Sequence, residues 1–143
     1  MTWAVLDDHL LRDLLADDLS EGLRDLLGGS APATTNLYLY RLSKSVVSAR
    51  GGSLTGGWTV EQRRSLGAQL VRLGDEVEIV PVWHLAFRMA EIADAYRLST
   101  LGAEAVAAAE RLHAPLCVWE GDDGPRIREA IGALGGEYRT IAR

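Results

Sequence analysis

The sequence predicts an α/β protein with a mostly parallel central sheet in a three-layer α/β/α sandwich. Short apolar runs alternate with stretches of helical periodicity along the chain, which is typical of strand–helix–strand crossovers. Two of these runs lead directly into acidic residues, as happens where parallel strands end at a ligand-binding edge. A length of 143 residues is typical of one domain, so we expect residues 1–143 to form a single domain.

The first quarter of the chain predicts a strand, two helices and a connection. Residues 3–7 form the expected first strand, because four apolar residues run into a carboxylate. Leucines recur at helical spacing over residues 8–17, which indicates an amphipathic helix. A second helix is expected to begin at Ser20 and to end at the Gly-Gly pair 28–29. Residues 31–33, Ala-Pro-Ala, are expected to form a short extended connection.

The middle of the chain predicts two helices around a glycine-rich stretch. One helix is expected over residues 34–49 and another from Thr59, each with apolar residues on one face. Between them, residues 50–57 predict a mobile connection, which lacks the GK[ST] ending of a phosphate-binding P-loop. Residues 77–82 are expected to form the next strand, and Pro81 marks an edge strand or a strand end.

The last third of the chain predicts three helices and two strands. Residues 84–97 and 100–113 have helical periodicity, and small residues on the second helix suit close packing on a sheet. Residues 116–119 are the next apolar strand. Pro125 fits the first position of a final helix, and residues 138–141 are expected to form a last edge strand.

Composition excludes several classes of protein. The single cysteine, Cys117, makes no intrachain disulfide and no zinc site built of cysteines. The sequence does not open on a basic-then-apolar signal peptide, and no apolar stretch approaches the ~20 residues that span a membrane. We therefore expect a cytoplasmic protein with no membrane partner. Arginine outnumbers lysine 14 to 1, a bias typical of bacterial genes rich in GC.

Positive charge is concentrated in one segment of a chain whose net charge is −5. Residues 41–72 hold six basic residues against one acid, whereas the segments on either side are acidic. A basic segment of this kind can follow a phosphate backbone. The residues that we expect to bind phosphate are Arg41, Lys44, Arg63 and Arg64. The alternative is that these residues lie on solvated helix faces.

Carboxylates follow two of the predicted strands. Asp7 and Asp8 follow the first strand, and Glu120, Asp122 and Asp123 follow the strand at residues 116–119. If the two strands are neighbours, these carboxylates converge at one edge of the sheet, and clustered carboxylates hold Mg²⁺ or Mn²⁺. A metal held there can activate water and stabilise phosphoryl oxygens. The alternative is that the acids cap helices and turns.

Other catalytic patterns are absent from the sequence. The histidines share no metal-ligand spacing such as H-E-x-x-H, and there is neither a G-x-S-x-G elbow nor a G-x-G-x-x-G turn. His9 follows the first two acids directly. It belongs either to a site with them or to the surface of the first helical turn.

Two stretches of the sequence carry a family resemblance. The chain opens on Val5-Leu6-Asp7 before a leucine-rich helix. Residues 98–118 read Leu-Ser-Thr-Leu-Gly-Ala-Glu-Ala-Val-Ala-Ala-Ala-Glu-Arg-Leu-His-Ala-Pro-Leu-Cys-Val, an alanine-rich helix before an apolar strand. In these stretches and in the order of its elements, the chain resembles the PIN-domain family over nearly its full length. The resemblance is greatest to small bacterial toxins like VapC.

The resemblance implies a fold, an activity and partners. The implied fold is the parallel α/β/α sandwich that the residues themselves predict. The implied activity is Mg²⁺- or Mn²⁺-dependent cleavage of RNA phosphodiesters by acids at the strand edge. The implied partners are RNA, an antitoxin-like protein and a second copy of the chain in a homodimer.

The family's four acidic positions are only partly kept. Asp7 and Glu120 match the first and fourth positions, which implies that they hold the metal. Asn36 and Gly102 stand at the second and third positions, so the implied site has diverged. Glu104 is two residues from Gly102, roughly 200° around a helix, so we expect its side chain to point away from the site.

Three roles therefore stay open. The first is a ribonuclease in which Asp8 or Asp122 adds a catalytic acid to the pair Asp7 and Glu120. The second is a non-catalytic PIN-like module that binds RNA or a protein through the basic segment 41–72. A purely structural role, in which the acids only cap helices, is the third and plainest alternative.

Overall fold

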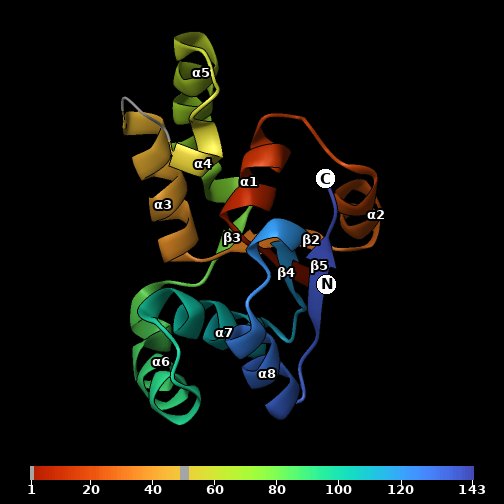
Figure 1. Ribbon diagram of the computed structural model, residues 1–143, viewed down its shortest axis with the longest axis vertical. Coiled ribbons are helices and arrows are strands. Elements are labelled where there is room, and N and C mark those ends of the chain that lie inside the picture. The colour runs from red at the N-terminus through yellow and green to blue at the C-terminus, as the bar shows by residue number, and fades with distance from the viewer. Residues whose placement is uncertain (1, 49–51) are drawn as a thin grey trace.

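The computed structural model describes residues 2–48 and 52–143 (Figure 1). Two short 3-10 helices, η1 (Leu73–Asp75) and η2 (Glu120–Asp122), accompany the main elements. In chain order the main elements are β1 (Trp3–Leu6), α1 (Asp8–Leu15), α2 (Glu21–Gly29), β2 (Ala31–Thr34), α3 (Asn36–Val47), α4 (Gly52–Thr55), α5 (Val60–Leu70), β3 (Glu78–Ile79), α6 (Val82–Tyr96), α7 (Thr100–Leu112), β4 (Leu116–Trp119), α8 (Pro125–Ala133) and β5 (Tyr138–Ile141).

The five strands form one parallel sheet in the order β3-β2-β1-β4-β5. β1 lies at the centre, where Trp3 is opposite Ala31 of β2 and Leu6 is opposite Cys117 of β4. Since each parallel strand must be reached by a crossover, helices cover both faces of the sheet. The predicted α/β class and three-layer α/β/α sandwich are therefore confirmed.

Alternate residues of β1 enter different hydrophobic clusters, because successive side chains of a strand point to opposite faces. Val5 packs in the cluster that α6, α7 and α8 build on one face. Ala4 and Leu6 pack on the other face, with leucines of α1 and α2. A third cluster joins α1 to α3, α4 and α5 through residues such as Leu11 and Leu42.

Hydroxyl side chains cap the first turns of four helices. Ser20, Thr35, Thr59 and Ser99 each accept a hydrogen bond from a backbone N–H three residues ahead. α6 is the longest helix, and no helix among the described residues is long and apolar enough to cross a membrane.

Two of the predicted boundaries are wrong. Residues 31–34 form β2 and not a connection, because residues 31–33 pair in parallel register with Trp3, Ala4 and Val5 of the central strand β1. The strand expected at residues 77–82 has only two residues, Glu78 and Ile79. It ends early because Pro81 becomes the N-cap of α6, which begins at Val82.

Part of the glycine-rich stretch forms a helical turn. Residues 52–55 make α4, whose Leu54 is buried. Arg12 of α1 donates a hydrogen bond through Nη1 to the Leu54 carbonyl (2.8 Å), and the Thr55 hydroxyl donates to the Ser45 carbonyl (3.0 Å). These contacts fix residues 52–55 against α1 and α3. The remainder of the expected mobile connection includes residues 50 and 51, which lie outside the described residues.

Candidate metal centre

The site is built around Asp7, which connects the ends of the two central strands. Asp7 follows β1 and is the N-cap of α1. Its Oδ1 accepts a hydrogen bond from the Leu10 N–H (2.9 Å), and its Oδ2 accepts one from the Trp119 N–H at the end of β4 (3.0 Å). Each oxygen keeps one lone pair, so both remain able to bind a cation.

Burial makes Asp7 hard to ionise without a cation. The side chain is 2% exposed, and loss of water raises its pKa from 3.8 to about 7. The two backbone N–H donors lower the pKa, whereas the negative charge of Asp8 raises it further. A divalent ion would reverse the balance, because it favours the charged carboxylate.

Asp8 and His9 occupy the first turn of α1 and are also buried. Asp8 Oδ1 accepts from the His9 N–H (3.0 Å) and lies 3.3 Å from His9 Nδ1. The N-terminal end of a helix favours negative charge, which helps to explain how two adjacent carboxylates fit here.

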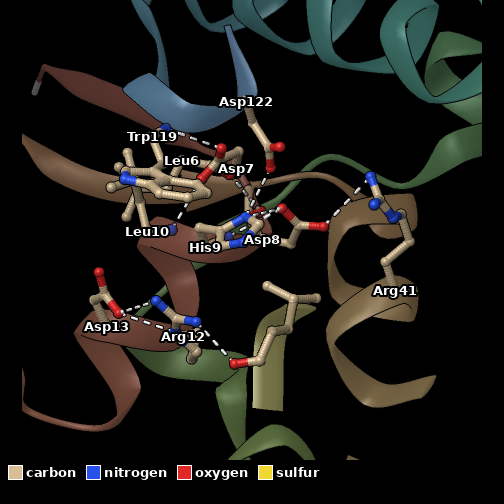
Figure 2. A network of polar contacts seen from close by, with 12 residues as sticks. Leu6, Asp7, Asp8, His9, Leu10, Arg12, Asp13, Arg41, Trp119 and Asp122 are labelled. Carbon is tan, nitrogen blue, oxygen red and sulfur yellow. Dashed lines mark hydrogen bonds and ion pairs between the residues drawn. The ribbon is translucent and has the colours of Figure 1, made fainter. Parts of the chain in front are cut away.

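Asp122 reaches this pair from the other strand, as Figure 2 shows. It lies in η2, directly after β4, and its Oδ2 is 2.8 Å from His9 Nδ1. The Asp122 side chain is 42% exposed, whereas those of Asp8 and His9 are at most 3% exposed. The cluster is therefore closed on the protein side and open to solvent beside Asp122.

Trp119 closes one side of the cluster. Its ring lies against the ring of His9, with centroids 4.6 Å apart. A Cβ on Gly121 would come within 2.6 Å of three atoms of the Trp119 ring, so only glycine allows this ring position beside the turn. The ring of Trp119 therefore packs between the backbone of this turn and the imidazole of His9, and so helps to fix the orientation of the imidazole.

Four side chains together could hold a metal ion. Asp7, Asp8, His9 and Asp122 each offer a ligand atom, and these atoms all lie within 4.8 Å of one another. Within the described residues, Asp8 Oδ2 and both ring nitrogens of His9 are buried without a hydrogen-bond partner. The contact between His9 Nδ1 and Asp122 has the distance of an ion pair but not the geometry of a hydrogen bond. Such unsatisfied atoms are costly unless a cation binds them.

A cation and a phenol border the cluster on the side of α3. Arg41 Nη1 lies 3.5 Å from Asp8 Oδ2, and the guanidinium is about half exposed (Figure 2). Tyr38 is buried on the same helix, and desolvation together with the charges of Asp7 and Asp8 raises the pKa of its hydroxyl well above 10. Tyr38 therefore stays neutral, and Arg41 is the charged group that faces solvent beside the site.

Of the acids that the sequence predicted, the structure brings three together. Asp7, Asp8 and Asp122 belong to the cluster, but Glu120 is exposed and is not among the four residues. Glu120 and Asp122 are the first and last residues of the same 3-10 turn. A rotation of about 120° per residue in such a turn directs the two side chains differently.

Asn36 and Gly102, the residues that depart from the implied acidic pattern, contact residues outside the four-residue cluster. Asn36 donates through Nδ2 to Glu104 Oε2 (2.6 Å) and to the Val80 carbonyl (2.8 Å). A Cβ on Gly102 would meet Ile127 of α8 at 3.3 Å. Glu104 was expected to point away from the implied site, but its side chain contacts Asn36, the residue that stands at the second position of that site. Glu104 is fully buried there against the first turn of α3.

The four predicted phosphate-binding residues are divided between two places. Arg41 lies beside the acidic cluster, and Lys44 is exposed one turn further along α3. Arg63 donates to the Ser48 carbonyl, and Arg64 lies 3.5 Å from Glu61 on α5. Among the described basic residues of segment 41–72, Arg41 is the one that borders the candidate metal centre.

His9 is a buried member of the cluster, whereas the sequence left open whether it belongs to a site or to the surface. The sequence feature that indicates His9 is its position directly after two acids at the end of a buried strand, where the first turn of a helix faces the sheet edge.

Comparison of the sequence with models of known families found no match, and comparison with curated proteins found none either. The evidence for the candidate metal centre is therefore the geometry of its residues alone.

Proposed function

We propose that this protein is a PIN-like, metal-dependent ribonuclease whose acidic site has been rebuilt around Asp7, Asp8, His9 and Asp122. The observation that carries the proposal is the convergence of these four ligand atoms within 4.8 Å at the carboxyl edge of a parallel sheet. The proposed setting is the cytoplasm, with an antitoxin-like protein as regulator.

The donor set favours Mn²⁺ over Mg²⁺. Three carboxylates suit either ion, but an imidazole ligand favours the transition metal, whereas Mg²⁺ prefers oxygen ligands and retained water. A bound ion would activate water and neutralise charge on the phosphate during cleavage. Asp7 and Asp8 would hold the ion from the buried side, and His9 would add the imidazole.

The remaining groups of the site would position the RNA. The Arg41 side chain is about half exposed beside Asp8, so an edge of its guanidinium can donate two hydrogen bonds to two oxygens of a phosphate. Asp122 lies at the solvent side, where its free oxygen can orient the attacking water and accept its proton. The water oxygen then bonds to phosphorus, the bond from phosphorus to the leaving ribose oxygen breaks, and that oxygen takes up the proton.

The two acids of η2 provide a matched test. We expect Asp122→Asn to weaken Mn²⁺ binding at least tenfold in calorimetric titration, since it removes one charged ligand. Glu120→Gln changes an exposed acid in the same turn and should leave Mn²⁺ affinity unchanged. The same samples are then assayed for cleavage of single-stranded RNA with Mn²⁺ and with a chelator.

The outcomes separate this proposal from the site that the family resemblance implies. Mn²⁺-dependent cleavage that Asp122→Asn reduces and Glu120→Gln does not would support the rebuilt site. A loss caused by Glu120→Gln instead would show that the metal sits further out on η2. The absence of saturable Mn²⁺ binding by the wild type would contradict the ribonuclease proposal as a whole.

A hollow between α3 and α5 favours a second function, the binding of an acidic protein segment. Its volume is about 260 Å³, and Val47 and Val60 in its wall are 86% and 64% exposed. Arg63 and Arg64 lie beside these valines. We expect an acidic amphipathic helical peptide to bind there and Val60→Glu to abolish its binding. Unchanged binding by Val60→Glu would contradict this assignment.

A further inference from the structure

The carboxyl end of β5 lies at the same edge of the sheet as the candidate metal centre. β5 is parallel to β4, and Ile141 of β5 is opposite Trp119 of β4. Because parallel strands bring their carboxyl ends to one edge, the residues that follow β5 emerge beside the turn that holds Asp122. Arg143 is one of these residues, and Figure 1 shows this end of the chain near α1. The edge that carries the acids therefore also carries a basic side chain.

Two contacts hold Arg143 at this edge. Its Nε lies 2.9 Å from Oδ2 of Asp13, a residue of α1 whose side chain is 2% exposed. Its guanidinium carbon lies 5.9 Å from the centroid of the Trp119 ring, within the range of a cation–π contact. The ring of His9 packs against the same indole. The Arg143 guanidinium and an imidazole of the metal centre are therefore both neighbours of one tryptophan ring.

Positive charge exceeds negative charge around Asp13. Arg12 Nε donates a hydrogen bond to Asp13 Oδ1 (3.0 Å), and Arg143 lies against Oδ2, so two guanidinium groups share one carboxylate. Arg12 is 4% exposed and also donates to the Leu54 carbonyl, so its charge lies inside the protein. The Arg143 side chain is 36% exposed. The excess positive charge is therefore presented to solvent at Arg143.

The guanidinium of Arg143 also has donors to spare. Its contact with Asp13 has the distance of an ion pair, but within the described residues Asp13 Oδ2 has no hydrogen-bond partner. An arginine side chain carries five N–H donors in a planar fork, which matches two oxygens of a phosphate. Because the buried carboxylate already holds the fork in place, a phosphate can bind with less loss of side-chain entropy.

Arg41 and Arg143 lie on opposite sides of the acidic cluster. Arg41 is on α3, which follows β2, whereas Arg143 follows β5. In the sheet order, β1 and β4 lie between these two strands, and the residues after β1 and β4 form the cluster. In Figure 2, Arg41 lies on one side of Asp8, and Trp119 and Asp13, the neighbours of Arg143, lie on the other. A strand of nucleic acid that crosses this edge would meet one guanidinium on each side.

We propose that Arg143 is a second phosphate-binding position, which holds the RNA strand on the β5 side of the metal centre, opposite Arg41. This inference rests on the proposed ribonuclease function, because it describes how that site holds its substrate. A phosphate contact carries no sequence information, so Arg143 positions the strand and does not select its sequence.

Anisotropy of a fluorescein-labelled single-stranded RNA, measured with a chelator that prevents cleavage, tests binding apart from catalysis. We expect Arg143→Gln to lower the slope of log affinity against log salt by about 0.7, as for one phosphate contact, which is about a fivefold loss at 0.1 M salt. Arg139→Gln is the matched control, since Arg139 of β5 is 46% exposed and also paired with a carboxylate, that of Glu137. It should bind RNA like the wild type.

Cleavage kinetics with Mn²⁺ give a second readout. Because Arg143 contacts a phosphate that does not react, Arg143→Gln should raise KM about fivefold and leave kcat within about twofold. Arg143→Lys keeps the charge and should restore most of the salt slope. Asp13 keeps Arg12 as its partner in both variants, so their thermal unfolding midpoints should match that of the wild type.

The outcomes separate this inference from the proposed function. If the wild type binds and cleaves RNA and Arg143→Gln has an unchanged salt slope and KM, the inference is overturned and the ribonuclease proposal stands. An equal loss in Arg139→Gln, or a fall in kcat at unchanged KM in Arg143→Gln, would also overturn it. A wild type that neither binds nor cleaves RNA would contradict both proposals.

Discussion

At the scale of single residues, Asp7 and Gly121 set the geometry of the site. Asp7 bridges the N-terminus of α1 and the end of β4 with two hydrogen bonds. Gly121 leaves the space in which Trp119 packs beside His9. Neither effect comes from a metal, so both can be tested on the metal-free protein.

We expect Gly121→Ala to displace the Trp119 ring, because the new Cβ would overlap it. The expected cost is about 1–3 kcal/mol of unfolding free energy, with a changed near-ultraviolet circular dichroism spectrum. Gly28→Ala is the matched control, since a Cβ there meets nothing within 4 Å. Inside α2 it should be neutral or stabilise by up to about 1 kcal/mol. Equal effects of the two substitutions would contradict the role of Gly121.

The raised pKa of Asp7 makes metal-free stability depend on pH. Between pH about 4 and about 7 the folded protein binds a proton at Asp7 that the unfolded chain has released, so stability falls as pH rises. The fall amounts to up to about 4 kcal/mol and levels off above pH 7. Urea unfolding in the presence of a chelator measures it, and Asp7→Asn should remove this part of the slope.

Saturating Mn²⁺ should reverse that slope, because metal and protons compete for the same carboxylate. Stability in Mn²⁺ is then expected to rise with pH over the same interval. An identical pH profile with and without Mn²⁺ would show that Asp7 is not a ligand.

At the scale of elements, a side chain of α7 caps the first turn of α3. Glu104 of α7 accepts hydrogen bonds from the backbone N–H groups of Asn36 (3.1 Å) and Leu37 (2.8 Å). A carboxylate at this end is also favoured by the helix dipole. The contact holds α3, and with it Arg41, at the sheet edge.

We expect Glu104→Gln to destabilise the fold by about 2–3 kcal/mol, because an amide cannot accept from both backbone donors with both of its polar atoms. Thermal unfolding measures this loss. Glu129→Gln on α8 changes an exposed glutamate and should alter stability by at most about 0.5 kcal/mol. A loss that is no larger for Glu104→Gln than for this control would argue against the anchoring role.

The elements also show what the sequence can predict. Apolar runs and caps located β1, β4 and most helices, and the acids after β1 and β4 indicated the edge of the sheet at which the acidic cluster lies. The sequence could not show that Asp122 points into the cluster and Glu120 to solvent. In a tight turn such as η2, a shift of one residue changes the direction in which a side chain points. The sequence also predicted that Glu104 points away from the implied site, whereas the structure places it against Asn36, because this contact depends on how α3 and α7 pack.

At the scale of the whole molecule, the sheet order places every feature of the account. β1 and β4 are neighbours at the centre, so Asp7, Asp8 and Asp122 meet at one edge, with Arg41 of α3 beside them. α6 lies outside α7, away from this edge, as Figure 1 shows.

The most direct test of the metal centre is anomalous diffraction from crystals grown with Mn²⁺, collected near the manganese absorption edge. The account predicts one strong peak bound by Asp7, Asp8 and Asp122, with an imidazole nitrogen of His9 as a further ligand. Crystals of the Asp122→Asn variant grown in the same way should show a much weaker peak. A map without a peak among these residues, or with its peak at Glu120 instead, would contradict the account.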